Sequence, residues 1–178
     1  MRNRSLIRRT DPKVRTRSRQ PRFVAVRLQA FTLTLLAGLA LGCRTVPPMP
    51  QVDLEAWGWQ VHRGQAVWNP RRGAQEMAGE LIVATHAHGR AFVQFTKEPF
   101  SIVTAQVDTR AWQVTFPGHG RSWRGRGKPP VRWLWLQLPR AVVGDSPEPP
   151  WQVSRRDPAT FSLANPATGE RLTGFLAP

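Results

Sequence analysis

Four apolar segments separated by short turns lie between residues 77 and 116, and they constrain the fold more than any other feature. Each is six to nine residues long and rich in β-branched and aromatic side chains. In the last segment every second residue is apolar, which is the period of a strand with one buried face. The turns hold only two to four residues, so the segments have to run antiparallel. The pattern predicts a meander of strands over 77–85, 90–97, 100–107 and 111–116.

Weaker patterns follow the meander and precede it. The stretch from Arg121 to Pro130 is basic and rich in glycine, and we expect a loose loop there. The apolar stretch 131–138 predicts a short helix that stops at Pro139. Residues 54–61 fit either a helical turn or a strand. Three more strands are expected over 151–153, 160–163 and 171–176, so the fold class is α+β and mostly β.

Cys43 is the only cysteine of the 178 residues, and it follows a basic head and an apolar segment. Residues 1–43 hold ten Arg or Lys and one Asp, which is most of the net charge of +15. The apolar segment 28–42 has 15 residues, fewer than the ~20 that cross a bilayer as a helix. This order is typical of a secretory signal, and export argues against a nucleic-acid partner.

The small residues Ala40 and Gly42 flank Leu41 directly before Cys43, which resembles the lipobox of bacterial lipoproteins. The alternative is a lone buried cysteine, but no second cysteine is present to pair with it. The resemblance implies a signal peptide over 1–42 and an acylated Cys43 held by membrane lipids. Arg44 stands where an aspartate would retain the protein in the inner membrane, so we expect the outer membrane, facing the periplasm. A proline-rich tether over 43–53 and a domain over 54–178 would follow.

The sheet meander, the segment WLWLQLP (133–139) and the late segment FSLANPATGERLTGF (161–175) resemble the LolB family of outer-membrane lipoproteins. The resemblance implies a curved antiparallel half-barrel with short covering helices, an interior that holds acyl chains, and other lipoproteins or a periplasmic carrier as partners. In that family a Pro-apolar corner protrudes and touches the membrane. TKEPFSIV (96–103) matches it, with Pro99 and Phe100 as the tip.

Large apolar residues on the expected strands and helix are candidates to line the interior. A lipid cavity and a filled core have the same sequence signature, so a structural envelope protein without a ligand stays open as the alternative. The expected inward-facing residues are Leu81, Val83, Phe92, Trp112, Val114, Phe116, Trp133 and Leu136.

Charged and polar residues offer little chemistry beyond anion contacts. Four basic residues of the expected loop fit either lipid phosphates or a solvated surface, namely Arg121, Arg124, Arg126 and Lys128. His86 and His88 lie two residues apart, but the nearest carboxylate is Glu80, so we expect no metal. No nucleophile motif or carboxylate pair stands out, and we expect neither an enzyme nor a cofactor.

Overall fold

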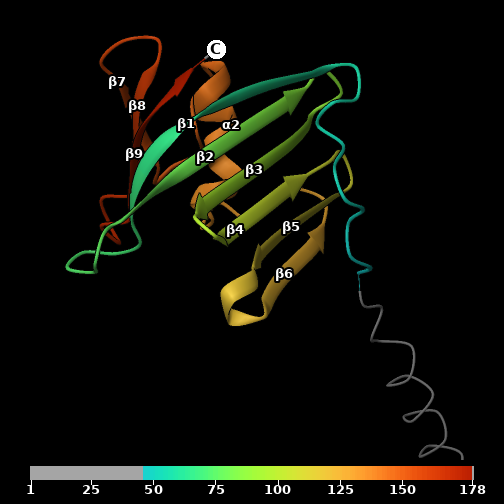
Figure 1. The fold of residues 1–178 in the computed structure, drawn as a ribbon, viewed down its shortest axis with the longest axis horizontal. Coiled ribbons are helices and arrows are strands. Elements are labelled where there is room, and N and C mark those ends of the chain that lie inside the picture. The colour runs from blue at the N-terminus through green and yellow to red at the C-terminus, as the bar shows by residue number, and fades with distance from the viewer. Residues whose placement is uncertain (1–45, 178) are drawn as a thin grey trace, which may run out of the picture. The chain divides into compact units, whose positions relative to one another are not determined.

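The computed structural model describes residues 46–177, and within them the chain forms nine strands and one α-helix (Figure 1). All nine strands belong to one open antiparallel sheet, in the order β6-β5-β4-β3-β2-β1-β9-β8-β7. The strands β2 to β5 form the predicted meander, β1 and β6 extend it on either side, and β9 returns to pair with β1. The bounds are β1 Trp59–Asn69, β2 Met77–His86, β3 Arg90–Lys97, β4 Phe100–Val107, β5 Ala111–Phe116, β6 Arg121–Arg126, α2 Leu134–Val143, β7 Gln152–Arg155, β8 Thr160–Ala164 and β9 Arg171–Ala177. A 3-10 turn, η1 (Pro117–His119), joins β5 to β6.

Two strands differ from the sequence-based expectation. Over the stretch 121–130 the prediction of a loose loop is wrong, because β6 pairs with β5 along its full length, from Phe116↔Arg121 to Ala111↔Arg126. The longest strand, β1, covers eleven residues of which only the first three were considered as a strand. Pairing with neighbours on the sheet, rather than the local pattern, determines both strands.

The helix α2 begins and ends later than the sequence predicts. It begins at Leu134 and continues through Pro139 to Val143, so the expected stop at the proline is wrong. Pro139 removes one hydrogen bond within the helix. The helix ends at Gly144, which has a φ of 92° and donates its N–H to the Arg140 carbonyl. A left-handed glycine of this kind is a common helix terminator.

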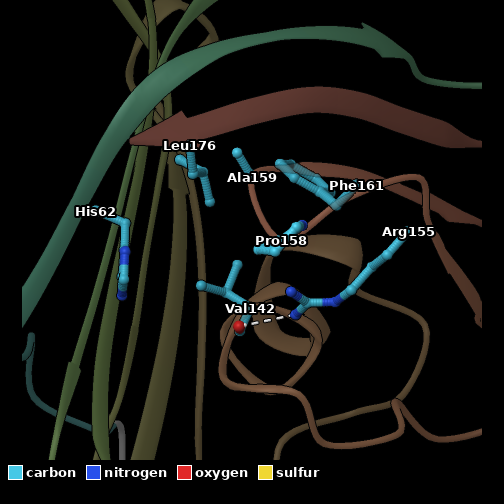
Figure 2. A pocket seen from close by; sticks show the side chains of 7 residues that line it. All are labelled: His62, Val142, Arg155, Pro158, Ala159, Phe161 and Leu176. Atoms are coloured by element: carbon cyan, nitrogen blue, oxygen red, sulfur yellow. Dashed lines mark hydrogen bonds between the residues drawn. The ribbon is translucent and has the colours of Figure 1, made fainter. Parts of the chain in front are cut away.

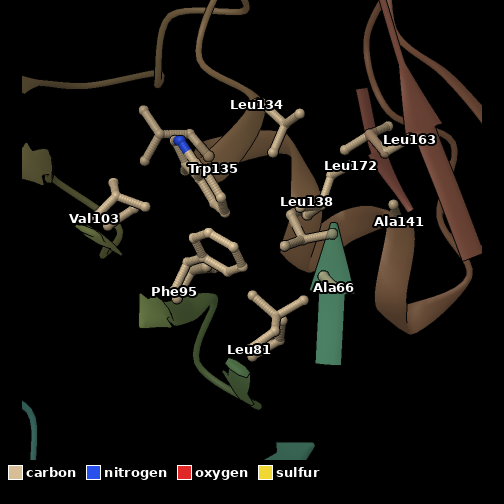
Figure 3. Packing of buried hydrophobic residues seen from close by; sticks show 14 of the residues in the cluster. Ala66, Leu81, Phe95, Val103, Leu134, Trp135, Leu138, Ala141, Leu163 and Leu172 are labelled. Atoms are coloured by element: carbon tan, nitrogen blue, oxygen red, sulfur yellow. The ribbon is translucent and has the colours of Figure 1, made fainter. Parts of the chain in front are cut away.

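The core lies between α2 and one side of the sheet, which we call the helix-facing side. Figure 3 shows Trp135 and Leu138 of α2 directed toward Phe95 and Leu81 of the strands, with Leu134 near the strands β8 and β9. The side chains of Trp135, Phe95 and Leu81 are at most 1% exposed. The other side of the sheet is called the outer side.

The sheet is strongly curved around α2. Trp68 of β1 and Phe116 of β5 are four strands apart in the sheet, yet their ring centroids lie 6.3 Å apart. Glycines allow the tight bend on the side of β1, because a Cβ at Gly64, Gly79 or Gly174 would collide with a carbonyl oxygen of the neighbouring strand. Aromatic rings therefore meet at the end of the meander that contains Phe100, which we call the Phe100 end.

The segment 46–58, part of which was expected to be a tether, lies against the sheet. The Met49 N–H donates to Gln113 Oε1 at 2.9 Å, and Arg124 Nη1 donates to the Val46 carbonyl at 3.4 Å. In Figure 1 this segment descends past the ends of the meander strands. The first described residues after Cys43 are thus held at β5 and β6.

Candidate functional site

The structure brings together seven of the eight residues expected to line the interior. Five of them are buried in the helix-facing core, and Phe116 and Trp133 are half-buried against it. The prediction that Phe92 faces the interior is wrong. Its neighbour Val93 belongs to the helix-facing core, and successive side chains of a strand point to opposite sides, so Phe92 lies on the outer side. The five buried residues are Leu81, Val83, Trp112, Val114 and Leu136.

Side chains fill the centre of this interior. Trp135 of α2 stacks on Phe95 with ring centroids 5.5 Å apart and meets Trp68 edge-on at 5.0 Å. The indole N–H groups of Trp133 and Trp135 are buried, and neither has a hydrogen-bond partner within the described residues. An unpartnered buried donor has a free-energy cost, so these two indoles reduce the stability gained from the packing.

Open space remains at the far end of the interior, near the C-terminus of α2. We call this the His86 end of the meander. A cavity of about 160 Å³ lies between β1, β9 and the end of α2 (Figure 2). Its walls are mainly apolar, with His62 on one side and Arg155 at the rim. The lining residues are His62, Val142, Arg155, Pro158, Ala159, Phe161 and Leu176.

A second cavity of about 360 Å³ lies on another part of the surface of α2 at the same end. Gln60, Thr85 and Ala91 contribute to it from three adjacent strands, and Pro139 and Val143 from the helix. Val143 is 50% exposed although it is aliphatic. The C-terminal half of α2 therefore adjoins two hollows, whereas its N-terminal half is tightly packed.

Polar contacts hold α2 at its C-terminus and at Gln137 in its first half. The Arg155 guanidinium donates to the carbonyls of Ala141 and Val142 at the helix C-terminus, the second at 2.8 Å. Such a cation also complements the helix dipole. On the same helix, the Gln137 Oε1 accepts from the Glu148 backbone N–H at 3.2 Å. Within the described residues α2 is the one α-helix that covers the apolar side of the sheet. These contacts therefore hold α2 against the sheet.

The predicted tip at Pro99 and Phe100 lies at the β3–β4 turn. Phe100 is 70% exposed and pairs with Lys97 as the strands separate. Burying a phenyl ring is favourable by roughly 2 kcal/mol, and this ring does not gain it within the domain. The exposed position that the sequence predicts for Phe100 is confirmed, while its contact with a membrane stays a prediction.

Sequence reasoning missed an open groove of about 600 Å³ on the outer side at the Phe100 end. Val67 and Phe175 lie in it, 39% and 50% exposed, and Lys97 connects it to the Phe100 tip. Three of the five exposed large apolar side chains in the described residues thus lie at or beside this groove. The sequence did carry one signal for it. In β1, Arg63, Gln65 and Val67 alternate with the small residues Gly64 and Ala66, which is the period of a strand.

The four basic residues expected to contact anions do not share one surface. Trp123 points to the helix-facing core, so Arg124 and Arg126 lie on the outer side of β6 and Arg121 on the other. Lys128 instead forms an ion pair with Glu148 at 2.8 Å. Lys128, followed by Arg140, lowers the pKa of the Glu148 carboxyl.

His86 and His88 participate in local structure. The Nδ1 atom of His86 accepts from the His88 backbone N–H at 3.2 Å, and the two rings lie 5.1 Å apart. The pKa of His86 is lowered, first by burial and then by the charges of Arg90 and His88. A hydrogen bond to the Trp57 backbone raises this pKa, but by less. Within residues 46–177 no three His, Cys, Asp or Glu residues gather as metal ligands.

Comparison with known proteins adds no relative, since neither a family model nor a curated protein matches this chain. Among the residues that the structure describes, no helix has the length and apolarity to cross a membrane. Cys43, the expected lipidation site, lies outside the described residues.

Proposed function

We propose that the chain is an outer-membrane lipoprotein that binds acyl chains between α2 and the sheet and aids the localisation of other lipoproteins. The observation that carries the proposal is the arrangement of α2. One helix covers the apolar side of a curved sheet, and hollows adjoin its C-terminal half. The half-barrel named by the family resemblance is part of the same proposal.

Acyl-chain binding requires α2 to move. The mainly apolar cavity of about 160 Å³ is smaller than the ~300–1,000 Å³ of typical ligand pockets. Pro139 weakens the middle of the helix, and the Trp135 N–H has no hydrogen-bond partner among residues 46–177. A chain that enters beside Val142 would displace the helix outward and enlarge the existing space.

The remaining features fit a protein that meets lipid. Acylated Cys43 would anchor the domain, and more than one acyl chain makes such anchoring stable. Phe100 and the groove at Val67 and Phe175 would contact a bilayer or a partner lipoprotein. The alternative is a structural envelope protein, favoured by the dense packing of Trp135 and Phe95.

Titration with a fluorescent fatty acid tests the proposal on the protein lacking residues 1–43, since residues from Val46 onward form one compact unit. We expect saturable binding. Ala159→Phe should fill the cavity at Val142 and weaken binding about tenfold, which corresponds to the loss of ~1.4 kcal/mol.

Ala167→Phe is the matched control, because Ala167 is exposed in the β8–β9 turn and does not line that cavity. It should leave the affinity for the probe unchanged. If the unmodified domain binds no probe saturably, the interior is a filled core and the alternative holds.

A further inference from the structure

The path of the chain toward Cys43 places one edge of the sheet near the anchor. Arg124 Nη1 donates to the carbonyl of Val46 at 3.4 Å, and Val46 is three residues from Cys43. Since one residue spans at most ~3.6 Å, Cys43 lies at most about 11 Å from Val46 along the chain. If Cys43 carries the anchor, β6 has to lie close to the bilayer surface.

The outer side of β6 carries the right charge for that surface. Arg124 and Arg126 lie there by strand alternation, and Arg110 is held beside them because its carbonyl accepts from the Gly127 N–H at 2.7 Å. Arg110 and Arg126 are exposed. Lipid phosphates attract basic residues near a membrane, and the arginine fork suits phosphate oxygens.

Acidic residues near this edge are occupied elsewhere. Asp108 Oδ1 accepts the backbone N–H groups of Arg110 and Ala111 in the β4–β5 turn, both at 2.6 Å. Glu148 pairs with Lys128 and Arg140. The arginine side chains of Arg110 and Arg126 are absent from the ion pairs formed among the described residues.

We propose that the outer side of β6, with Arg110, Arg124 and Arg126, binds the phosphate groups of anionic lipids in the anchoring membrane. The inference rests on the proposed acylation of Cys43 and adds the orientation of the domain. The separation is at most about 11 Å, for a fully extended chain, and a bent path of the same three residues brings β6 within the screening length of about 8 Å at physiological salt. β6 is also a terminal strand within the described sheet, and the surface would cover that edge.

Vesicle sedimentation tests this on the protein lacking residues 1–43, so that no anchor contributes. We expect binding to vesicles with 30% phosphatidylglycerol and little binding to pure phosphatidylcholine. Binding should weaken between 0.1 M and 1 M salt, as the screening length falls from about 10 Å to about 3 Å. Arg110→Glu/Arg126→Glu should lower binding at least about tenfold, because it replaces two residues attracted to anionic lipid with two that are repelled by it.

Arg63→Glu/Arg171→Glu is the matched control. Both residues are exposed on the outer side of β1 and β9, and the change in net charge is the same. It should retain most of the binding. Equal losses in the two double variants would mean that only the net charge of the protein matters. Equal binding to both kinds of vesicle would exclude a contact with the lipid phosphates. Either outcome overturns the proposal. Fatty-acid titration and labelling of Cys43, made without vesicles, test the proposed function separately.

Discussion

At the scale of single residues, Glu170 connects the domain's stability to pH. Its Oε1 accepts the Trp68 indole N–H at 3.2 Å in the turn before β9. Burial raises the pKa of this carboxyl to about 7, more than the indole donor lowers it. The folded protein therefore keeps a proton that the unfolded chain releases, so Glu170 adds stability as the pH falls from about 7 toward 4.5.

We expect the difference in unfolding free energy between wild type and Glu170→Gln to depend on pH. Relative to the variant, wild type should gain about 1 to 3 kcal/mol between pH 8 and pH 5. The amide oxygen of the variant still accepts from Trp68. The lowered pKa of His86 acts in the opposite direction, but it is present in both proteins. Urea unfolding at several pH values measures this, with exposed Glu80→Gln as the control; a constant difference would contradict it.

The exposed ring of Phe100 gives a second prediction at this scale. Because the side chain is 70% exposed, Phe100→Glu should leave the melting temperature within about 2 °C of wild type. The same change should abolish association with liposomes or transfer of a lipoprotein, because a carboxylate opposes burial in lipid.

Phe95→Ala is the contrasting variant, since Phe95 is fully buried against Trp135. It should lower the unfolding free energy by about 3 to 5 kcal/mol. A fall in unfolding free energy of that size in Phe100→Glu would instead mean that Phe100 belongs to the core and is not an exposed tip.

The sequence predicted single side chains well where one side of a strand is apolar. In β5, Trp112 and Val114 alternate with polar residues, and both are buried as expected. In β3 the pattern is ambiguous, because Phe92 and Val93 are adjacent and both apolar. Only pairing within the sheet determines which one faces α2, and Phe92 was therefore placed on the wrong side.

At the scale of elements, prediction failed where tertiary contacts replace local preference. The strand β1 directs His62, Gly64 and Ala66 toward the helix, and Trp68 near its end is the one large apolar residue on that side, so the strand shows no apolar period. The strand β6 has one large apolar residue, Trp123, and forms by pairing with β5. The helix α2 passes Pro139 because six consecutive residues from Leu134 are buried, which compensates for the lost hydrogen bond.

The fastening of α2 by Arg155 gives a prediction for an element. Arg155→Ala removes the donor to the Ala141 and Val142 carbonyls. We expect the unfolding free energy to fall by about 1 to 2 kcal/mol and the fluorescent fatty acid to bind faster, because the C-terminal half of α2 is released.

Arg156→Ala is the control for Arg155, since it removes an exposed arginine from the next position. Stopped-flow mixing with the probe measures the rate. An unchanged rate in a destabilised Arg155→Ala variant would mean that opening of α2 at this end does not limit entry.

At the scale of the whole molecule, the proposal depends on Cys43 as the anchor. The basic head, the apolar segment 28–42 and the small residues before Cys43 predict acylation, and cleavage there would remove nine of the fifteen net positive charges. The structure adds the position of the chain after the anchor. Val46 is bonded to Arg124 of β6, and Cys43 lies three residues before Val46.

Cells grown with a palmitate analogue should label the wild-type protein, and Cys43→Ser should lose the label and leave the membrane fraction. Density-gradient separation should place the labelled protein with the outer membrane, since Arg44 follows the cysteine. Arg44→Asp is an informative partner: it keeps the acylation site but supplies the inner-membrane retention residue, so label should persist while the protein shifts to the inner membrane. Label that persists in Cys43→Ser would reject the anchor, and with it the orientation proposed for β6.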